Sequence, residues 1–143
     1  MFVEVGVFVL LKDDIIALKQ TELETDCKIV WTKLEAAGYE AVFVASYYRP
    51  HENDKYSLAE LQKSLAIICN TTVSHVWIGG DFNLPGYDWK TNDLKKGCHQ
   101  PKPTRSFLDM ISENGLVQIV EDPTFFENTL DLFLVNNPSG AEL

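Results

Sequence analysis

The sequence feature that most constrains the fold is a strand–helix–strand order in the middle of the chain. Residues 39–48 are apolar almost throughout, as in a strand covered on both faces. Apolar residues then recur at helical spacing over residues 57–70, and Ser57 with Glu60 forms a capping-box pattern at the start of this helix. A second apolar run follows at residues 73–79. This order predicts an α/β protein in which a helix packs on one face of a sheet.

The flanking segments add strands and a second helix. Thr104 is a suitable cap for a helix that carries apolar residues at helical spacing and ends at Gly115. A long loop over residues 81–103 precedes it, and long loops in compact domains are often functional. The first two flanking strands are expected to form a hairpin, and the whole set predicts a mixed sheet. These expected strands are residues 5–11, 15–18, 27–34, 116–120 and 130–135.

Length and composition predict one domain in a reducing compartment. The 143 residues suffice for a buried core, and the 45% hydrophobic and 23% charged fractions are ordinary for a globular protein. No apolar stretch reaches the length of a bilayer span, and the first residues lack the pattern of a signal peptide. Three widely spaced cysteines do not suggest a disulfide framework, and Cys98-His99 lacks the partners of a zinc site. We therefore expect an intracellular protein without a membrane segment, with the nucleus among the candidate compartments.

The net charge of −9 argues weakly against a nucleic-acid partner. Proteins that hold nucleic acid through its phosphates usually present a basic face. Twelve Lys and Arg against 21 Asp and Glu do not supply one overall. A local basic strip is nevertheless open to such a partner: Lys90, Lys95, Lys96, Lys102 and Arg105.

Polar residues at the end of the second apolar run form the first candidate site. Asp81 and Asn83 follow two glycines in the sequence GGDFN, where a strand of an α/β sheet would reach its carboxyl end and face a ligand crevice. A carboxylate there can hold a divalent cation or take a proton from water, and an amide can bind a phosphate oxygen. The alternative is a turn in which both side chains only satisfy nearby backbone groups.

Two other strand ends carry polar groups with similar potential. Tyr48 can reach a phosphate, and Arg49 offers a planar charged fork for substrate binding, although a sheet-rim aromatic is the simpler interpretation of this pair. Asp131 lies within an otherwise apolar strand, where a carboxylate needs a partner such as a histidine, an arginine or a metal. The three histidines lie in three different sequence contexts, and none is assigned a catalytic role.

In combination, these stretches resemble three motifs of the endonuclease/exonuclease/phosphatase superfamily. The motifs are Tyr48-Arg49-Pro50, Gly80-Asp81-Phe82-Asn83 and Leu130-Asp131-Leu132-Phe133, in this order. The stretches DFNLPGYDW, FLDMISENGLVQIVEDPT and TLDLFLVNNP are similar to the apurinic-like endonuclease domains of non-LTR retrotransposons. The likeness extends from about Val5 to Pro138. It implies the four-layer α/β sandwich of the DNase I-like type, with mixed sheets and helices packed outside.

The resemblance also implies roles for four side chains. Tyr48 matches a tyrosine that contacts the scissile phosphate, and Asp81 an aspartate that handles the proton of the attacking water or of the leaving group. Asn83 matches an asparagine that helps to place water and phosphate. Asp131 matches an aspartate that orients a catalytic histidine. The family uses Mg²⁺ or Mn²⁺, and the intact retrotransposon enzymes act on DNA; the resemblance implies no protein partner.

The chain also departs from the family pattern. The family's metal-binding asparagine and glutamate come from earlier strands, and its Ser-Asp-His signature should follow the strand that contains Asp131. Neither is present, so no metal ligand is assigned within residues 1–143. We therefore expect a single domain truncated at both ends, with little or no nuclease activity alone. A phosphatase of the same fold, acting on a phosphorylated lipid or inositol, and a non-catalytic binding module are the alternatives.

Overall fold

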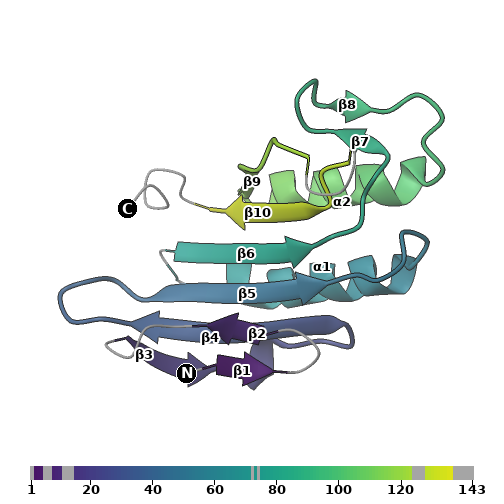
Figure 1. Ribbon diagram of the computed structural model, residues 1–143. Coiled ribbons are helices and arrows are strands. Elements are labelled where there is room, and N and C mark those ends of the chain that lie inside the picture. The colour runs from purple at the N-terminus through teal and green to yellow at the C-terminus, as the bar shows by residue number, and fades with distance from the viewer. Residues whose placement is uncertain are drawn as a thin grey trace.

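The computed structural model describes residues 2–4, 8–10, 15–71, 73, 75–123 and 128–136. A six-stranded mixed sheet with the order β3-β4-β5-β6-β10-β9 forms its centre (Figure 1). The strands of this sheet are β3 (Ile16–Lys19), β4 (Lys28–Glu35), β5 (Val42–Tyr48), β6 (His75–Asp81), β9 (Val117–Gln118) and β10 (Asp131–Val135). Strands β5 and β6 are parallel, and every other neighbouring pair is antiparallel.

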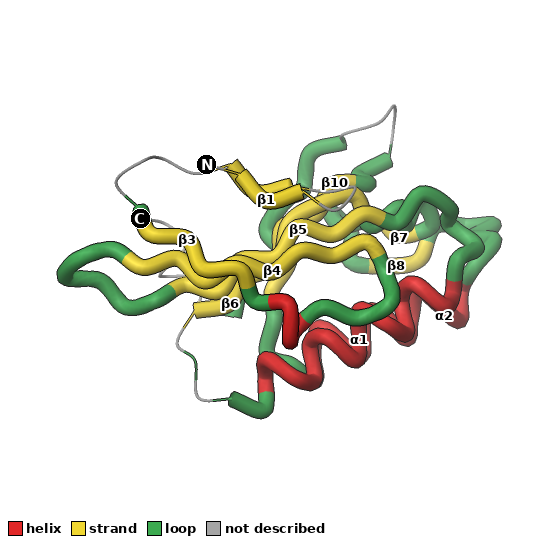
Figure 2. Tube along the Cα trace, turned by 90° about the horizontal axis from the view of Figure 1, so that it is seen from below, coloured by secondary structure: helices red, strands yellow, loops and turns green. Residues whose placement is uncertain are grey.

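Two helices and two small sheets complete the described fold. Helix α1 (Lys55–Cys69) connects the parallel pair, and α2 (Pro101–Glu113) precedes β9. Both helices lie on the same face of the sheet, as Figure 2 shows. A short 3-10 helix, η1, spans Thr21–Leu23, and the small sheets pair β1 (Phe2–Glu4) with β2 (Phe8–Leu10) and β7 (Tyr87–Asp88) with β8 (Asp93–Leu94). The α/β class and the mixed sheet are therefore confirmed. No described helix is both long enough and apolar enough to cross a bilayer.

The core lies between the sheet and the two helices. Alternate residues of each strand point toward the helices, so that Tyr47 of β5 and Trp31 of β4 are buried against α1. The Trp31 Nε1 donates to the Ser64 Oγ at 2.7 Å, and the hydroxyls of Tyr47 and Ser57 form a hydrogen bond. Burial raises the pKa of the Tyr47 hydroxyl. These two buried polar contacts fix the position of α1 along the sheet.

The start of α1 differs from the predicted capping box. Asp54 is the N-cap, and its side chain accepts a hydrogen bond from the Ser57 N at 3.0 Å. The Ser57 hydroxyl is turned to the sheet instead, and the Glu60 carboxylate accepts from the Asp26 N and pairs with Lys63. The prediction failed because Ser57 and Glu60 both found partners on neighbouring elements, while Asp54 supplied the cap.

Helix α2 begins one turn earlier than predicted. Its N-cap is Gln100, and prolines are accommodated in its first turn because the N–H groups there need no partner within the helix. Thr104 therefore lies inside the helix, where its Oγ1 donates to the Gln100 carbonyl at 2.7 Å. The predicted end at Gly115 is confirmed: this residue has a φ of 67°, and the Leu116 N donates back to the Ile111 carbonyl.

The strands at the start of the chain pair differently from the predicted hairpin. Strand β3 pairs with β4, while β2 pairs with β1, so the expected pairing between residues 5–11 and 15–18 is wrong within the described residues. The turn expected for this hairpin, at residues 12–14, lies outside the residues that the structure describes. The predicted loop over residues 81–103 contains the β7–β8 hairpin, and its last residues belong to α2.

The face of the sheet away from the helices is less covered than predicted. Strand β2 lies against β4 and β5 on this face (Figure 2). The side chains of β5 that point the same way, Val42, Val44 and Tyr48, are nevertheless partly exposed. The prediction of a strand covered on both faces is therefore wrong for β5. The candidate site residues at its carboxyl end can meet a ligand from this side.

Candidate active site

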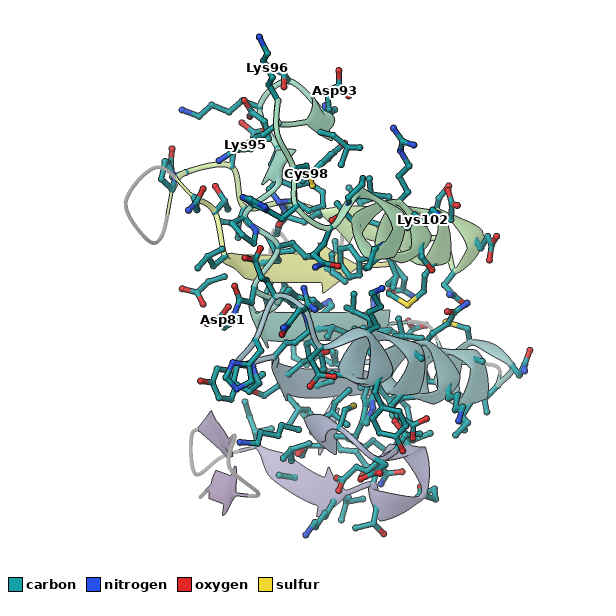
Figure 3. The ribbon with its side chains drawn as sticks, turned by 90° about the vertical axis from the view of Figure 1, so that its right-hand side faces the viewer. Asp81, Asp93, Lys95, Lys96, Cys98 and Lys102 are labelled. Atoms are coloured by element: carbon teal, nitrogen blue, oxygen red, sulfur yellow. The ribbon has the colours of Figure 1, made fainter. Side chains whose placement is uncertain are left out.

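Strand register brings three of the predicted site residues side by side. Asp81, at the end of β6, pairs with Tyr48 of the parallel β5 and with Asp131 of the antiparallel β10. Paired residues on neighbouring strands project to the same face of a sheet. Because the preceding Tyr47 points toward α1, these three side chains lie on the face away from the helices. Figure 3 looks onto these strand ends and shows Asp81 on that side.

The row continues into β4 with a residue that sequence reasoning missed. Lys28 pairs with Tyr48, and its Nζ lies 5.4 Å from the centroid of the Tyr48 ring. We call Lys28, Tyr48, Asp81 and Asp131 the catalytic row. The alternation of residues 27–34 indicated a half-exposed strand, but it could not show which residue would stand beside Tyr48. The structure thus places the ammonium group of Lys28 beside the Tyr48 ring.

Asp81 is held by its own loop and shaped by its neighbours. The Asn83 N donates to the Asp81 Oδ1 at 3.0 Å. Partial burial, and next the negative charge of Asp131, raise the pKa of the Asp81 carboxyl. The residue before it must be glycine, because Gly80 has a φ of 144° and a Cβ there would lie 1.8 Å from the Tyr47 carbonyl oxygen. Gly80 thus lets β6 approach β5 closely where the carboxylate is placed.

Asn83 lies beside the catalytic row, not within it. Its φ of 51° is in the left-handed region, which asparagine tolerates better than most residues. Its Nδ2 donates to the Pro50 carbonyl oxygen at 3.0 Å, which ties the loop after β6 to the loop after β5. The amide is therefore fixed next to Asp81. The side chain satisfies a backbone group, as the structural interpretation predicted, while its role in placing water or phosphate stays a prediction.

Arg49 has a structural position that does not fit the expected substrate-binding role. The side chain is 0% exposed. Its Nε donates to the Phe82 carbonyl at 2.8 Å, and its Nη2 to the Asn83 carbonyl at 2.8 Å. Its Nη1 donates to the carbonyls of Glu52 and Asp54. Burial lowers the pKa of the guanidinium. The guanidinium therefore joins two loops at the end of the sheet, and it is not exposed to a substrate.

A polar hollow of about 550 Å³ adjoins the row at the strand ends. The loops after β5 and β6, the segment before α2 and the segment before β10 all contribute to it. His51 and His99 line it together, so the view that the three histidines occupy separate contexts is wrong for these two. His75 lies at the other end of β6, where its Nε2 is 3.1 Å from the Glu40 Oε2. A separate hollow of about 270 Å³ lies between α1 and α2, on the opposite face from the row.

The basic strip noted in the sequence does not form one surface. Lys95 and Lys96 lie on the segment after β8, and Lys102 lies in the first turn of α2, well apart from them in Figure 3. The Lys95 Nζ donates to the Asn128 Oδ1 at 2.8 Å. Only the hairpin part of the strip is therefore close to the segment that leads into Asp131.

Comparison with known proteins places this geometry in a family. Residues 42–142 match the model of the endonuclease-reverse transcriptase family, and the chain belongs to this family. Comparison with curated protein sequences gives no match. The resemblance to the endonuclease/exonuclease/phosphatase superfamily, and to the endonucleases of non-LTR retrotransposons within it, is thereby confirmed.

Two solved structures share the fold. One is the endonuclease domain of TRAS1, a telomere-specific non-LTR retrotransposon, with a TM-score of 0.62 and 16% identity over 89% of this chain and 56% of that chain. The other is the human Nocturnin catalytic domain with bound sulfate anion, with a TM-score of 0.59 and 13% identity over 91% of this chain and 51% of that chain. The predicted DNase I-like α/β fold is thus confirmed. The chain spans about half the length of these two structures.

Proposed function

We propose that the catalytic row serves the metal-dependent hydrolysis of a phosphodiester, with DNA as the substrate. The observation that carries this proposal is the register that sets Tyr48, Asp81 and Asp131 side by side on three neighbouring strands. A phenol and two carboxylates at one sheet edge can meet one phosphate group together. Membership of the endonuclease-reverse transcriptase family supports the same chemistry.

The two carboxylates fit a divalent cation. Asp81 and Asp131 face each other across β6 and β10, and like charges in directly opposed positions repel each other. A Mg²⁺ or Mn²⁺ ion between them would relieve this repulsion and, when bound, neutralise charge on the phosphate. The described residues contain no group of three or more histidine, cysteine or acidic side chains that could hold a metal. Phosphate oxygens and water would therefore complete the coordination, so that metal and substrate bind together.

The protein's own side chains supply the remaining steps. The hydrogen bond from the Asn83 N occupies the Asp81 Oδ1 and leaves Oδ2 to accept the proton of the attacking water. The Tyr48 hydroxyl can donate to a non-bridging phosphate oxygen, and Lys28 beside it adds positive charge at the same edge.

The four residues of the row do not include a histidine, the group that the family resemblance places near Asp131. A phosphodiesterase without this group loses part of its electrostatic stabilisation of the transition state. We therefore propose that the chain, by itself, binds metal and DNA weakly and cleaves slowly or not at all.

A phosphatase acting on a small phosphorylated lipid or inositol is the second candidate. The net charge of −9 favours it, since a small substrate needs fewer phosphate contacts than a nucleic acid does. Both candidates use the same row. They differ in the expected effect of Mn²⁺: a DNA endonuclease should bind a DNA duplex more tightly when Mn²⁺ is present, and a phosphatase should not.

The test measures binding of a fluorescent DNA duplex by anisotropy, with and without Mn²⁺. We expect Mn²⁺ to tighten duplex binding, and Asp81→Asn or Asp131→Asn to remove this effect. The control is Asp109→Asn, because Asp109 is an exposed carboxylate on α2, behind the sheet. An inositol phosphate is titrated in parallel. If Mn²⁺ tightens only the inositol phosphate, the phosphatase is favoured; if it tightens neither, the proposal is wrong.

A further inference from the structure

We infer that the polar hollow beside Asn83 is a nucleobase-binding pocket for the nucleotide next to the scissile phosphate. This inference deepens the proposed function and rests on it for the position of the phosphate. Its basis is the set of side chains that line the hollow, which bring four carboxamides and two imidazoles together from loops far apart in the sequence. These side chains are Asn53, Asn83, Gln100 and Asn128, with His51 and His99.

The charge of the pocket does not suit a phosphate. Among the described residues, no lysine or arginine lines it, and Glu52 adds a carboxylate. Phosphate sites in proteins draw on cationic side chains or on clustered backbone N–H groups. Carboxamides, by contrast, carry both a donor and an acceptor, and they read the edges of bases. The ligand chemistry that matches this lining is a neutral group rich in hydrogen-bonding atoms.

Two of the amides are already oriented by the protein. The Asn83 Nδ2 donates to the Pro50 carbonyl, which leaves its Oδ1 as an acceptor for a ligand. The Asn128 Oδ1 accepts from the Lys95 Nζ, which leaves its Nδ2 as a donor. Every base presents a donor beside an acceptor: adenine and cytosine through an amino group and a ring nitrogen, and guanine and thymine through a ring N–H and a carbonyl. A fixed acceptor and a fixed donor in one pocket therefore suit the edge of a base.

The remaining walls suit a flat ring. Pro50, Pro85 and Leu130 give the pocket apolar surfaces, and the exposed imidazoles of His51 and His99 can stack on a base. A volume of about 550 Å³ is that of an ordinary small-ligand pocket and leaves room for a base with its sugar. The pocket is preformed, because Arg49 ties the loop carbonyls of Glu52 and Asn83 into one frame.

The place of the pocket relative to the row explains its use. Each of three row residues is followed or preceded, within two positions, by a residue that lines the pocket: Pro50 follows Tyr48, Asn83 follows Asp81 and Leu130 precedes Asp131. A nucleotide with its base in the pocket therefore has its phosphate at the strand ends. An inositol or a lipid headgroup offers no flat aromatic ring to these walls.

The experiment is a two-dimensional NMR titration of the whole chain with deoxyadenosine, deoxycytidine, thymidine and, separately, inorganic phosphate. We expect the side-chain amide signals of Asn83, Gln100 and Asn128 to shift with all three nucleosides and not with inorganic phosphate. The variant Asn128→Ala should weaken deoxyadenosine binding about 5-fold, the effect of one hydrogen bond. Gln62→Ala, in the hollow between α1 and α2, should leave it unchanged.

Two results would overturn the inference: equal shifts with inorganic phosphate alone, or no shift with any nucleoside at millimolar concentration. Failure of the proposed function gives a different pattern. Asp81→Asn should leave nucleoside binding intact, because Asp81 is not part of the pocket lining. Nucleoside binding without any Mn²⁺ effect on DNA would therefore contradict the proposed function while supporting the pocket.

Discussion

Replacement of Arg49 should show that this side chain holds the site together and does not bind substrate. The variant Arg49→Met keeps an unbranched apolar side chain but removes the donors to the four carbonyl oxygens. Each hydrogen bond from a charged group contributes about 1.5–3 kcal/mol, and the four are not additive because water can reach part of the vacated site. We expect a loss of about 3–6 kcal/mol, which is a large fraction of the stability of an ordinary domain.

Urea unfolding, monitored by tryptophan fluorescence, measures this loss of stability. With a slope of roughly 2 kcal/mol/M, the midpoint of Arg49→Met should fall by about 1.5–3 M. The midpoint of Arg49→Lys should lie between those of the parent and of Arg49→Met, because an ammonium group cannot make the hydrogen bonds of a planar guanidinium. The control is Arg105→Met, on the exposed side of α2, which should change the free energy of unfolding by less than about 0.5 kcal/mol. Equal midpoints for the two methionine variants would refute the structural role of Arg49.

Three further predictions concern a core leucine, the glycine before Asp81 and the nuclease activity of the chain. Leu61→Ala should lower the free energy of unfolding by about 2–5 kcal/mol in the same urea assay, because Leu61 is 0% exposed between α1 and the sheet. Gly80→Ala should prevent normal folding, judged by amide dispersion in NMR spectra, because its Cβ would collide with the Tyr47 carbonyl, while Gly97→Ala meets no atom and should fold. The chain with Mg²⁺ should nick supercoiled plasmid little or not at all, and strong nicking abolished by Asp81→Ala would contradict this.

The raised pKa of the Asp81 carboxyl also leads to a prediction about pH. A carboxyl whose pKa is higher in the folded than in the unfolded protein destabilises the fold as pH rises from the unfolded value through the folded one. Asp81→Asn should therefore melt at a higher temperature than the parent at pH 7, and the difference should shrink as the pH falls toward the unfolded pKa. Calorimetry at several pH values measures this. A destabilised Asp81→Asn at pH 7 would show that the carboxylate is favourably paired.

The sequence predicted those parts of the fold that depend on local periodicity. The helical spacing of residues 57–70 and the apolar runs on either side of it led to the α/β class. The strand predicted over residues 73–79 was found as β6, which ends two residues later, at Asp81. Positions set by partners distant in the sequence were missed. Ser57 was read as a cap because its contact with Tyr47 could not be foreseen, and the cap itself is Asp54.

The candidate site shows the same division. Motif resemblance selected Tyr48, Asp81 and Asp131, and strand register places them together. Register cannot be read from spacing alone, so Lys28 was missed although it stands next in the row. Arg49 was assigned to substrate binding because its planar guanidinium lies at a strand end. Its burial depends on carbonyls that lie about thirty residues further along the chain.

Paramagnetic line broadening by Mn²⁺ tests the shared metal and phosphate site most directly. Increasing Mn²⁺ is added to isotope-labelled protein in the presence of a short DNA duplex, and the loss of each backbone amide signal is followed. Signals at the ends of β5, β6 and the start of β10, around Tyr48, Asp81 and Asp131, should disappear first. Asp81→Asn should abolish this selectivity. Broadening centred on the β7–β8 hairpin, or uniform broadening without a centre, would contradict the assignment of the catalytic row.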